Sequence, residues 1–321
     1  MNLRTASLVL DAGVEVAGAG SMQIAGNLIV PEQAPMALLV CLPGGGMNRR
    51  YFDLLPPDGS DAYSFARQMA HRGFASLLID PLGVGESSRP DDGYSLTPEV
   101  LARANANATG EVLRRLRAGM ALGGLEPLPQ IKAFGVGHSM GALMTILQQA
   151  ESAQYVGVAA LGFSTRGLPD FLPPEAKAMD DSSRRRELVR LARGLFRDSY
   201  PVLSRNDDRA GLYSGKSAEA PAVEAIKAAR DRLLPVPAFL SMLPGNVAAE
   251  AARIQVPVFV GLGERDLAGP PAEAPKAFTG SPAVTFHLLP DAGHSHFLFP
   301  ARVGLFDALA DWAGRIVSFR A

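Results

Sequence analysis

The chain has 321 residues, which is enough for one large domain or two medium ones with a substantial apolar core. Its formal net charge of -1 at pH 7 gives no electrostatic reason to expect nucleic acid or an anionic membrane as a partner. The single cysteine, Cys41, excludes an intramolecular disulfide, and no apolar run has the form of a signal peptide or the length of a membrane span. We therefore expect a soluble, cytoplasmic protein whose partner is a small molecule.

The N-terminal quarter of the chain predicts the beginning of a mixed sheet. Residues 5–30 alternate apolar and polar positions in short pieces, which is typical of antiparallel strands. Residues 36–42 and 74–79 are continuous apolar runs, as in strands that are covered on both faces. Between these runs, residues 63–71 have helical spacing, and Gly73 follows where glycine suits the end of a helix.

The loop after the strand at 36–42 reads Pro43-Gly44-Gly45-Gly46. Its glycines leave main-chain N–H groups uncovered, so the loop can cradle an anion or a developing oxyanion, although a permissive turn would have the same composition. Asp80, at the end of the next strand, is a second candidate for chemistry. A carboxylate at that place more often accepts hydrogen bonds from the loop that follows, and we prefer this structural role.

Residues 131–150 contain the pattern on which the functional prediction depends. Ile131 to Val136 is a short apolar run typical of a buried strand, and Leu143 to Ala150 has helical spacing. Between them, residues 137–141 read Gly-His-Ser-Met-Gly, which fits G-x-S-x-G. In a strand-turn-helix context this pattern describes a serine on a strained turn, where a Cβ on either glycine would collide with the neighbouring chain. A glycine-rich turn with an incidental serine is the alternative.

Two further elements complete the first part of the predicted sheet. Residues 97–117 predict a helix with Thr97 as N-cap and Pro98 at its first position. Residues 155–163 predict another buried strand. This alternation of strands and helices implies a parallel sheet with helices on both faces.

The alternation stops at Ser164. Residues 165–253 are charged, punctuated by proline and helical in pattern, with helices expected at 182–196 and 218–234 and no strand pattern. Their leucine, isoleucine and phenylalanine side chains could bury one apolar face. We therefore predict that this stretch is a helical cap inserted into the sheet-forming part of the chain.

The sheet pattern resumes after the cap. Strands are expected at 256–262 and 284–289, and an amphipathic helix at 305–319. The predicted core consequently has two parts, residues 1–164 and residues 254–321.

Three residues of the kinds that nucleophilic catalysis needs follow predicted strands. A serine hydroxyl is a weak nucleophile unless a base takes its proton, and that base must be oriented by a third group. Ser139, Asp266 and His294 each lie at the carboxyl end of a predicted strand. Because these ends line one edge of a parallel sheet, the three side chains can converge there.

On these motifs the chain resembles an α/β-hydrolase fold protein over nearly its whole length. The resemblance implies a mostly parallel central sheet flanked by helices, with an inserted helical cap, and the order Ser, Asp, His also agrees with this fold. Four motifs carry it: Gly-His-Ser-Met-Gly at 137–141, Pro-Gly-Gly-Gly at 43–46, Gly-Glu-Arg-Asp at 263–266 and Ala-Gly-His at 292–294.

The resemblance implies a role for each catalytic candidate. Ser139 is the nucleophile, His294 the general base and acid, and Asp266 the residue that fixes the tautomer of the histidine. Glu264 lies two residues before Asp266 and is the alternative acid. His296 is the alternative base, but the glycine before His294 matches the family pattern, so we expect His296 to line the pocket or to pack against the cap.

The oxyanion hole would use two main-chain N–H groups. By resemblance these belong to Met140 and Gly45, with Gly46 as the alternative, because many members carry His-Gly where this chain has Pro43-Gly44. His138, beside the nucleophile, is interpreted as structural.

We therefore expect a serine hydrolase without cofactor or metal that cleaves a carboxylic ester, a lactone or a thioester. An acyltransferase, a carbon–carbon bond hydrolase and a non-catalytic ligand-binding member of the fold are the alternatives. Tyr51 and the apolar side chains of the cap predict an apolar or aromatic substrate, with Tyr51 and His296 as contacts. Arg49, Arg50 and Arg89 lie in loops near the expected site and are candidates for binding a substrate carboxylate.

Overall fold

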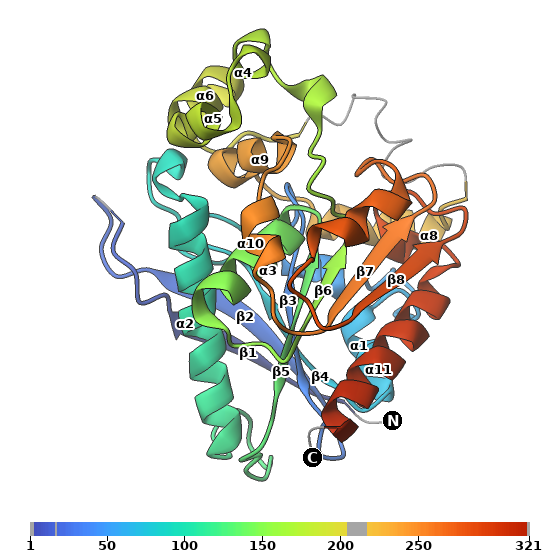
Figure 1. Cartoon of the computed structure of the whole chain (residues 1–321). Coiled ribbons are helices and arrows are strands. Elements are labelled where there is room, and N and C mark those ends of the chain that lie inside the picture. Colours follow the sequence, from blue (N-terminus) through green and yellow to red (C-terminus); the bar gives the residue numbers. More distant parts are fainter. Residues whose placement is uncertain (1–2, 17, 204–216, 320–321) are drawn as a thin grey trace.

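A computed structural model describes residues 3–16, 18–203 and 217–319 (Figure 1). An eight-stranded sheet runs through its centre, in the order β1-β2-β4-β3-β5-β6-β7-β8. The strands are β1 (Leu3–Asp11), β2 (Gln23–Pro31), β3 (Leu38–Leu42), β4 (Ala75–Ile79), β5 (Ala133–His138), β6 (Gly157–Leu161), β7 (Val258–Gly263) and β8 (Val284–Leu289).

The sheet is mostly parallel. β2 is antiparallel to both of its neighbours, β1 and β4, whereas every other neighbouring pair is parallel. The strands β3, β4 and β6 are buried along their whole length, as the continuous apolar runs predicted. The predicted α/β fold with a mostly parallel sheet is confirmed.

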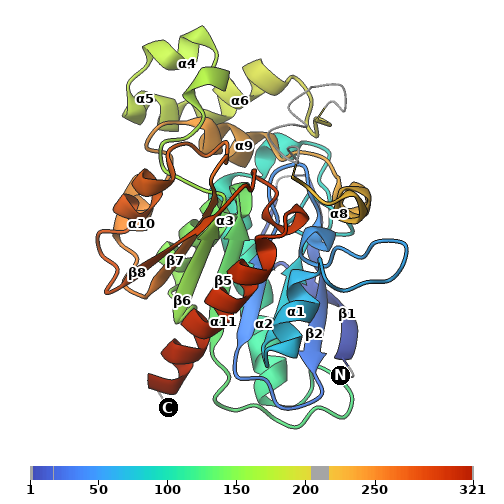
Figure 2. The ribbon, with the colours of Figure 1, turned by 90° about the vertical axis from the view of Figure 1, so that its right-hand side faces the viewer.

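Helices cover both faces of the sheet, and each face has its own apolar cluster. α1 (Phe65–His71) and α11 (Arg302–Phe319) pack on one face and lie in front of the sheet in Figure 2. α2 (Pro98–Arg117) and α3 (Met140–Ser152) lie on the other face, where α10 (Ala248–Ala252) packs against α3.

The helix predicted at 97–117 is confirmed, and its start follows the expected chemistry. The Thr97 side chain accepts a hydrogen bond from the main-chain N–H of Val100, and Pro98 occupies the first turn. Because the first N–H groups of a helix have no partner within it, such a cap stabilises the helix by about 1 kcal/mol.

Between β6 and β7 the described residues form helices and add no strand to the sheet. Four of these helices lie above the end of the sheet that carries the loop after β5, in both Figure 1 and Figure 2. They are α4 (Pro174–Ala178), α5 (Asp181–Arg186), α6 (Leu188–Phe196) and α9 (Pro235–Met242). α8 (Ala220–Ala225) instead packs beside the 3-10 helix His296–Leu298 of the core.

Two predicted helices of this region are wrong in extent. The helix predicted at 182–196 is two helices, α5 and α6, which meet at Glu187. The helix predicted at 218–234 ends at residue 229 after α8 and a short 3-10 turn. Asp231 accepts hydrogen bonds from the Gly85 N–H and the Asn48 amide, which ties the following segment to the core. Pro235 also disfavours helical backbone at Leu234.

Among the helices of the described residues, none is both long enough and apolar enough to cross a membrane.

Candidate active site

Ser139 lies on a sharp turn between β5 and α3. Its backbone has φ 56° and ψ −121°, a region that non-glycine residues rarely adopt. Its N–H donates to the Leu161 carbonyl at 2.8 Å, and its own carbonyl accepts from the Ala142 N–H at 2.9 Å. These bonds to β6 and to the first turn of α3 hold the strained conformation in place.

The two glycines of the motif are required by close main-chain approach. A Cβ added at Gly137 would lie 2.3 Å from the carbonyl oxygen of Gly141, and one added at Gly141 would lie 2.0 Å from that of Leu42. Neither neighbour is a flexible side chain that could move away. The strand, the turn and the helix therefore meet as the G-x-S-x-G pattern predicts.

Asp266 and His294 form a buried pair beside this turn. Nδ1 of His294 lies 2.7 Å from Oδ1 of Asp266, which also accepts a hydrogen bond from the Ala268 N–H at 2.9 Å. Burial alone would raise the pKa of Asp266, but His294 and His296 beside it hold that pKa well below its usual range. An ionised Asp266 accepts the Nδ1–H of His294 and leaves Nε2 as the basic nitrogen.

The structure distinguishes the candidate residues for the acid that orients the histidine. Glu264 is exposed and accepts a hydrogen bond from the Asp291 N–H at 3.0 Å, whereas Asp266 contacts His294. Asp80 accepts from the N–H groups of Arg49 at 2.7 Å and Glu86 at 3.0 Å. Asp80 also pairs with the Arg49 guanidinium, so it ties down the neighbouring loops.

Two more histidines surround the pair. Nε2 of His138 lies 2.8 Å from the carbonyl oxygen of His294, and Nε2 of His296 lies 2.8 Å from Oδ2 of Asp266. Burial lowers the pKa of His138 well below its usual range, and the neighbouring His294 and His296 lower it further. His296 is fully buried behind Asp266 and is not among the residues that line the cavity beside Ser139. Its position does not meet the expectation that it contacts the substrate.

The glycine loop lies next to the turn. A Cβ on Gly44 would lie 3.2 Å from that of Ser139, and one on Gly45 would lie 3.9 Å from that of Met140. Gly44 and Gly45 line the cavity beside Ser139, whereas Gly46 is not among its lining residues. Of the two predicted loop donors, Gly45 is therefore the better placed.

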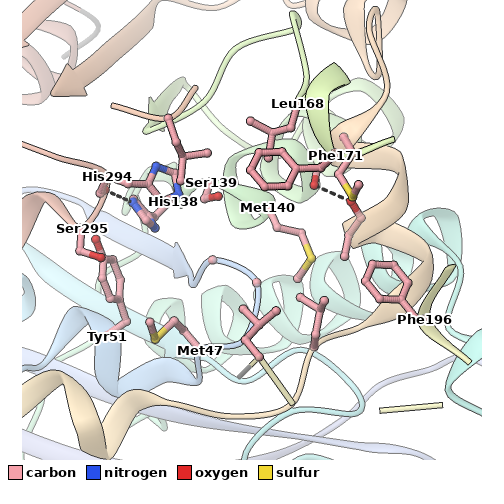
Figure 3. A pocket seen from close by; sticks show the side chains of 18 of the residues that line it. Met47, Tyr51, His138, Ser139, Met140, Leu168, Phe171, Phe196, His294 and Ser295 are labelled. Carbon is pink, nitrogen blue, oxygen red and sulfur yellow. Dashed lines mark hydrogen bonds between the residues drawn. The ribbon is translucent and has the colours of Figure 1, made fainter. Parts of the chain in front are cut away.

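A cavity of about 350 Å³ opens in front of Ser139 and His294 (Figure 3). Its wall is formed by core residues together with side chains from the helices above the sheet. The apolar ones are Met47, Tyr51, Met140, Leu168, Phe171, Leu195, Phe196, Leu203, Leu233, Ala238, Met242 and Leu267. Among the described residues, no charged side chain lines this cavity.

The predicted contacts lie at different places relative to this cavity. The ring of Tyr51 is part of the wall and stacks on His138 with 4.5 Å between ring centroids. Arg49, Arg50 and Arg89 are not lining residues, since Arg49 pairs with Asp80 and Arg89 lies over the ring of Tyr200. The three arginines are therefore not in position to bind a substrate carboxylate in this cavity.

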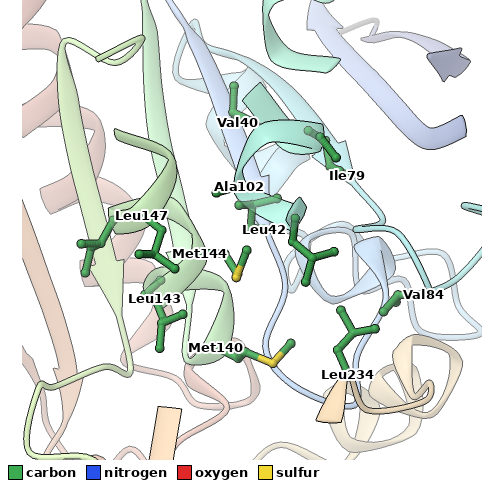
Figure 4. Packing of buried hydrophobic residues seen from close by; sticks show 14 of the residues in the cluster. Val40, Leu42, Ile79, Val84, Ala102, Met140, Leu143, Met144, Leu147 and Leu234 are labelled. Atoms are coloured by element: carbon green, nitrogen blue, oxygen red, sulfur yellow. The ribbon is translucent and has the colours of Figure 1, made fainter. Parts of the chain in front are cut away.

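Apolar side chains pack together behind the turn (Figure 4). Met140 and Leu143, at the start of α3, belong to one buried cluster. Leu42 of β3 and Leu234, the N-cap residue of α9, belong to the same cluster. Burial of each such side chain stabilises the fold by roughly 1.5–3 kcal/mol. The residue after Ser139 is thus anchored to the strand that leads into the glycine loop.

Some lining residues were not identifiable from the sequence. Leu168 and Phe171 follow β6, Met242 ends α9, and Ser295 lies between the two histidines of the last loop. Nothing in their local pattern distinguishes them from other apolar or loop residues. Only the way in which the helices fold over the sheet brings them to the cavity.

Comparisons with known proteins identify the fold and the family. The model of the alpha/beta hydrolase family matches residues 39–304. A highly thermostable carboxyl esterase from Bacillus coagulans, determined with glycerol, is 16% identical with a TM-score of 0.66, covering 99% of each chain. A thermophilic esterase from Thermogutta terrifontis is 18% identical with a TM-score of 0.58, covering 97% of this chain and 99% of that one.

A thioesterase domain from the curacin biosynthetic pathway is 15% identical with a TM-score of 0.57, covering 95% of this chain and 98% of that one. At these identities the solved structures show a common fold. No curated protein matches the sequence. Because the family model covers most of the chain, including the turn at Ser139 and the loops of Asp266 and His294, the protein belongs to the alpha/beta hydrolase family.

Proposed function

We propose that the protein is a serine hydrolase that cleaves a carboxylic ester with an uncharged, apolar or aromatic acyl group. The observation that carries this proposal is the buried Asp266–His294 pair beside the strained turn of Ser139, at the floor of an apolar cavity. In this proposal residues 165–253 form a cap over a core of residues 1–164 and 254–321. Side chains of the cap complete the cavity.

The chemistry follows from the roles of these groups. His294 takes the proton of the Ser139 hydroxyl as its oxygen attacks the ester carbonyl, and Asp266 stabilises the resulting imidazolium. The N–H groups of Met140 and Gly45 bind the oxyanion, each typically worth about 3 kcal/mol in such sites. His294 then returns the proton to the leaving alcohol. In the second half-reaction, water attacks the acyl-enzyme with His294 again as base.

A thioester is the second candidate substrate. The apolar cavity suits an acyl chain whether it is bonded to the oxygen of an ester or to the sulfur of a thioester. One of the proteins with a similar fold is a thioesterase domain. A thiol leaves more readily than an alcohol because it has the lower pKa, so the same residues can perform both cleavages.

The test is covalent labelling followed by turnover. A fluorophosphonate should add one adduct to the wild-type protein, measured as intact mass, and none to Ser139→Ala. Ser241→Ala is the matched control, because Ser241 lines the same cavity but donates to the Ala238 carbonyl, and it should still gain one adduct. Labelling of Ser139→Ala, or an unlabelled wild type, would refute an activated Ser139.

Turnover then distinguishes the reactions. Esters, thioesters and lactones with matched acyl groups should be compared by kcat/KM. Addition of an alcohol or a thiol reveals acyl transfer if the product is the new ester or thioester. Free acid as the main product supports hydrolysis.

A further inference from the structure

Asp266 lies between two imidazoles. Oδ1 is 2.7 Å from Nδ1 of His294, and Oδ2 is 2.8 Å from Nε2 of His296. The side chains of Asp266 and His296 are fully buried. An ionised carboxylate can only accept hydrogen bonds, so both histidines donate to it.

The bond to Asp266 is the single side-chain hydrogen bond that His296 makes within the described part of the chain. Its other ring nitrogen, Nδ1, is buried without a partner there. Protonation of Nδ1 would bury an unpaired donor, so this environment selects the tautomer with the proton on Nε2. The residue thus presents one donor, and this donor points at Oδ2 of Asp266.

We propose that His296 is a positioning residue that fixes the carboxylate of Asp266 for its interaction with His294. This inference rests on the proposed function, in which Asp266 orients the base. The χ2 torsion of an aspartate is broad, so a carboxylate held through one oxygen can rotate and misdirect the other partner. With Oδ2 held by His296 and Oδ1 held by the Ala268 N–H, Oδ1 stays directed at His294 while the proton moves.

The test replaces His296 by residues that differ in where they place a donor. The amide nitrogen of glutamine can occupy the position of Nε2, whereas that of asparagine falls near the position of Nδ1 and does not reach Asp266. We expect His296→Asn and His296→Leu to lower kcat roughly 10–100-fold with little change in KM, as for other groups that orient a catalytic ligand. His296→Gln should recover most of this loss.

A matched control removes a histidine elsewhere. His71, at the end of α1, pairs with Asp61, so His71→Leu should leave kcat unchanged. Melting temperatures of all variants show whether the compared proteins are folded. If His296→Leu does not fold, the comparison of His296→Gln with His296→Asn decides. Equal kcat in these two variants, or a kcat of His296→Asn within three-fold of the wild type, would overturn the inference.

A spectroscopic readout separates this inference from the proposed function. The proton between His294 Nδ1 and Asp266 should give a downfield proton resonance in the wild type and in His296→Gln. It should shift or disappear in His296→Asn. If the fluorophosphonate does not label the wild type but the variants show this pattern of resonances, the proposed function is rejected and the role of His296 stands. If the resonance is unchanged in all variants, that role is rejected.

Discussion

Nε2–H of His138 donates a hydrogen bond to the carbonyl oxygen of His294 over 2.8 Å. The residue before the proposed nucleophile therefore holds the main chain of the proposed base. Nδ1 of His138 has no partner in the described part of the chain, so the Nε2–H tautomer fits this geometry. His138 and His296 thus act on opposite sides of the pair, one on the backbone of His294 and the other on the carboxylate of Asp266.

Removal of the His138 donor should weaken catalysis. His138→Phe keeps an aromatic ring against Tyr51 but loses the bond to His294. A net hydrogen bond is worth about 1 kcal/mol, so we expect kcat/KM to fall roughly five-fold or more. His138→Gln, whose amide nitrogen can replace Nε2, is the control and should lose less. Equal values for the two variants would contradict a role for this bond.

The free energy of unfolding should decrease as the pH is lowered, in two separate pH ranges. Burial lowers the pKa of His138 below its unfolded value of 6.5, so below that pH the unfolded state binds more protons than the folded state. The contribution of neutral, buried His138 to the unfolding free energy is complete above pH 6.5 and is lost as the pH falls. Asp266, whose pKa is held below 3.8 in the folded protein, contributes above that value and loses its contribution as the pH falls further.

Urea unfolding at pH 7.5, 6.0 and 5.0 measures the first window. His138→Phe should lose less unfolding free energy than the wild type over this range, because it has no buried imidazole to protonate. Parallel curves for the wild type and His138→Phe would show that His138 is not the titrating group.

Gly141→Ala should destabilise the fold. The added Cβ would lie 2.0 Å from the Leu42 oxygen and 2.5 Å from the Pro43 oxygen, so main chain must move. We expect a loss of about 1–3 kcal/mol or more in unfolding free energy. Gly314→Ala in α11, where a Cβ meets no atom within 4 Å, is the control and should stabilise by about 0.5–1 kcal/mol. A Gly141→Ala protein as stable as the wild type would contradict the close approach.

The strands and the turn were predictable because their causes are local. A strand covered on both faces, such as β3 with Leu38–Leu42, has to be apolar at every position. A turn that brings two backbones together has to place glycine at 137 and 141. These requirements restrict the residue types at each position, so a single sequence is enough to predict the strands and the turn.

The rest depends on distant contacts. His294 and His296 are two residues apart in one loop, and only the position of Asp266 between their rings distinguishes the group near Ser139 from the one behind the carboxylate. The end of the helix near residue 229 likewise depends on hydrogen bonds from Gly85 and Asn48 to Asp231, more than 140 positions away along the chain. Spacing along the sequence contains no information about such partners.

The uncharged wall of the cavity predicts the substrate preference. A carboxylate that enters it leaves water and meets, among the described residues, no cationic side chain, which costs several kcal/mol. We expect kcat/KM for a butyrate ester to exceed that for the hemisuccinate ester of the same alcohol by at least about 100-fold. Arg49→Ala would break the pair with Asp80, so Arg50→Ala is the matched control and should leave this ratio unchanged.

The size of the cavity should be set by the helices above the sheet. Phe196, at the end of α6, lines the cavity on the side away from Tyr51 (Figure 3). Phe196→Ala enlarges this side, so the acyl length with the highest kcat/KM should increase, measured with a series of p-nitrophenyl esters. Phe286→Ala on β8, which is exposed and does not line the cavity, should leave the optimum unchanged. An optimum that shifts equally in both variants, or in neither, would mean that the acyl chain does not bind beside α6.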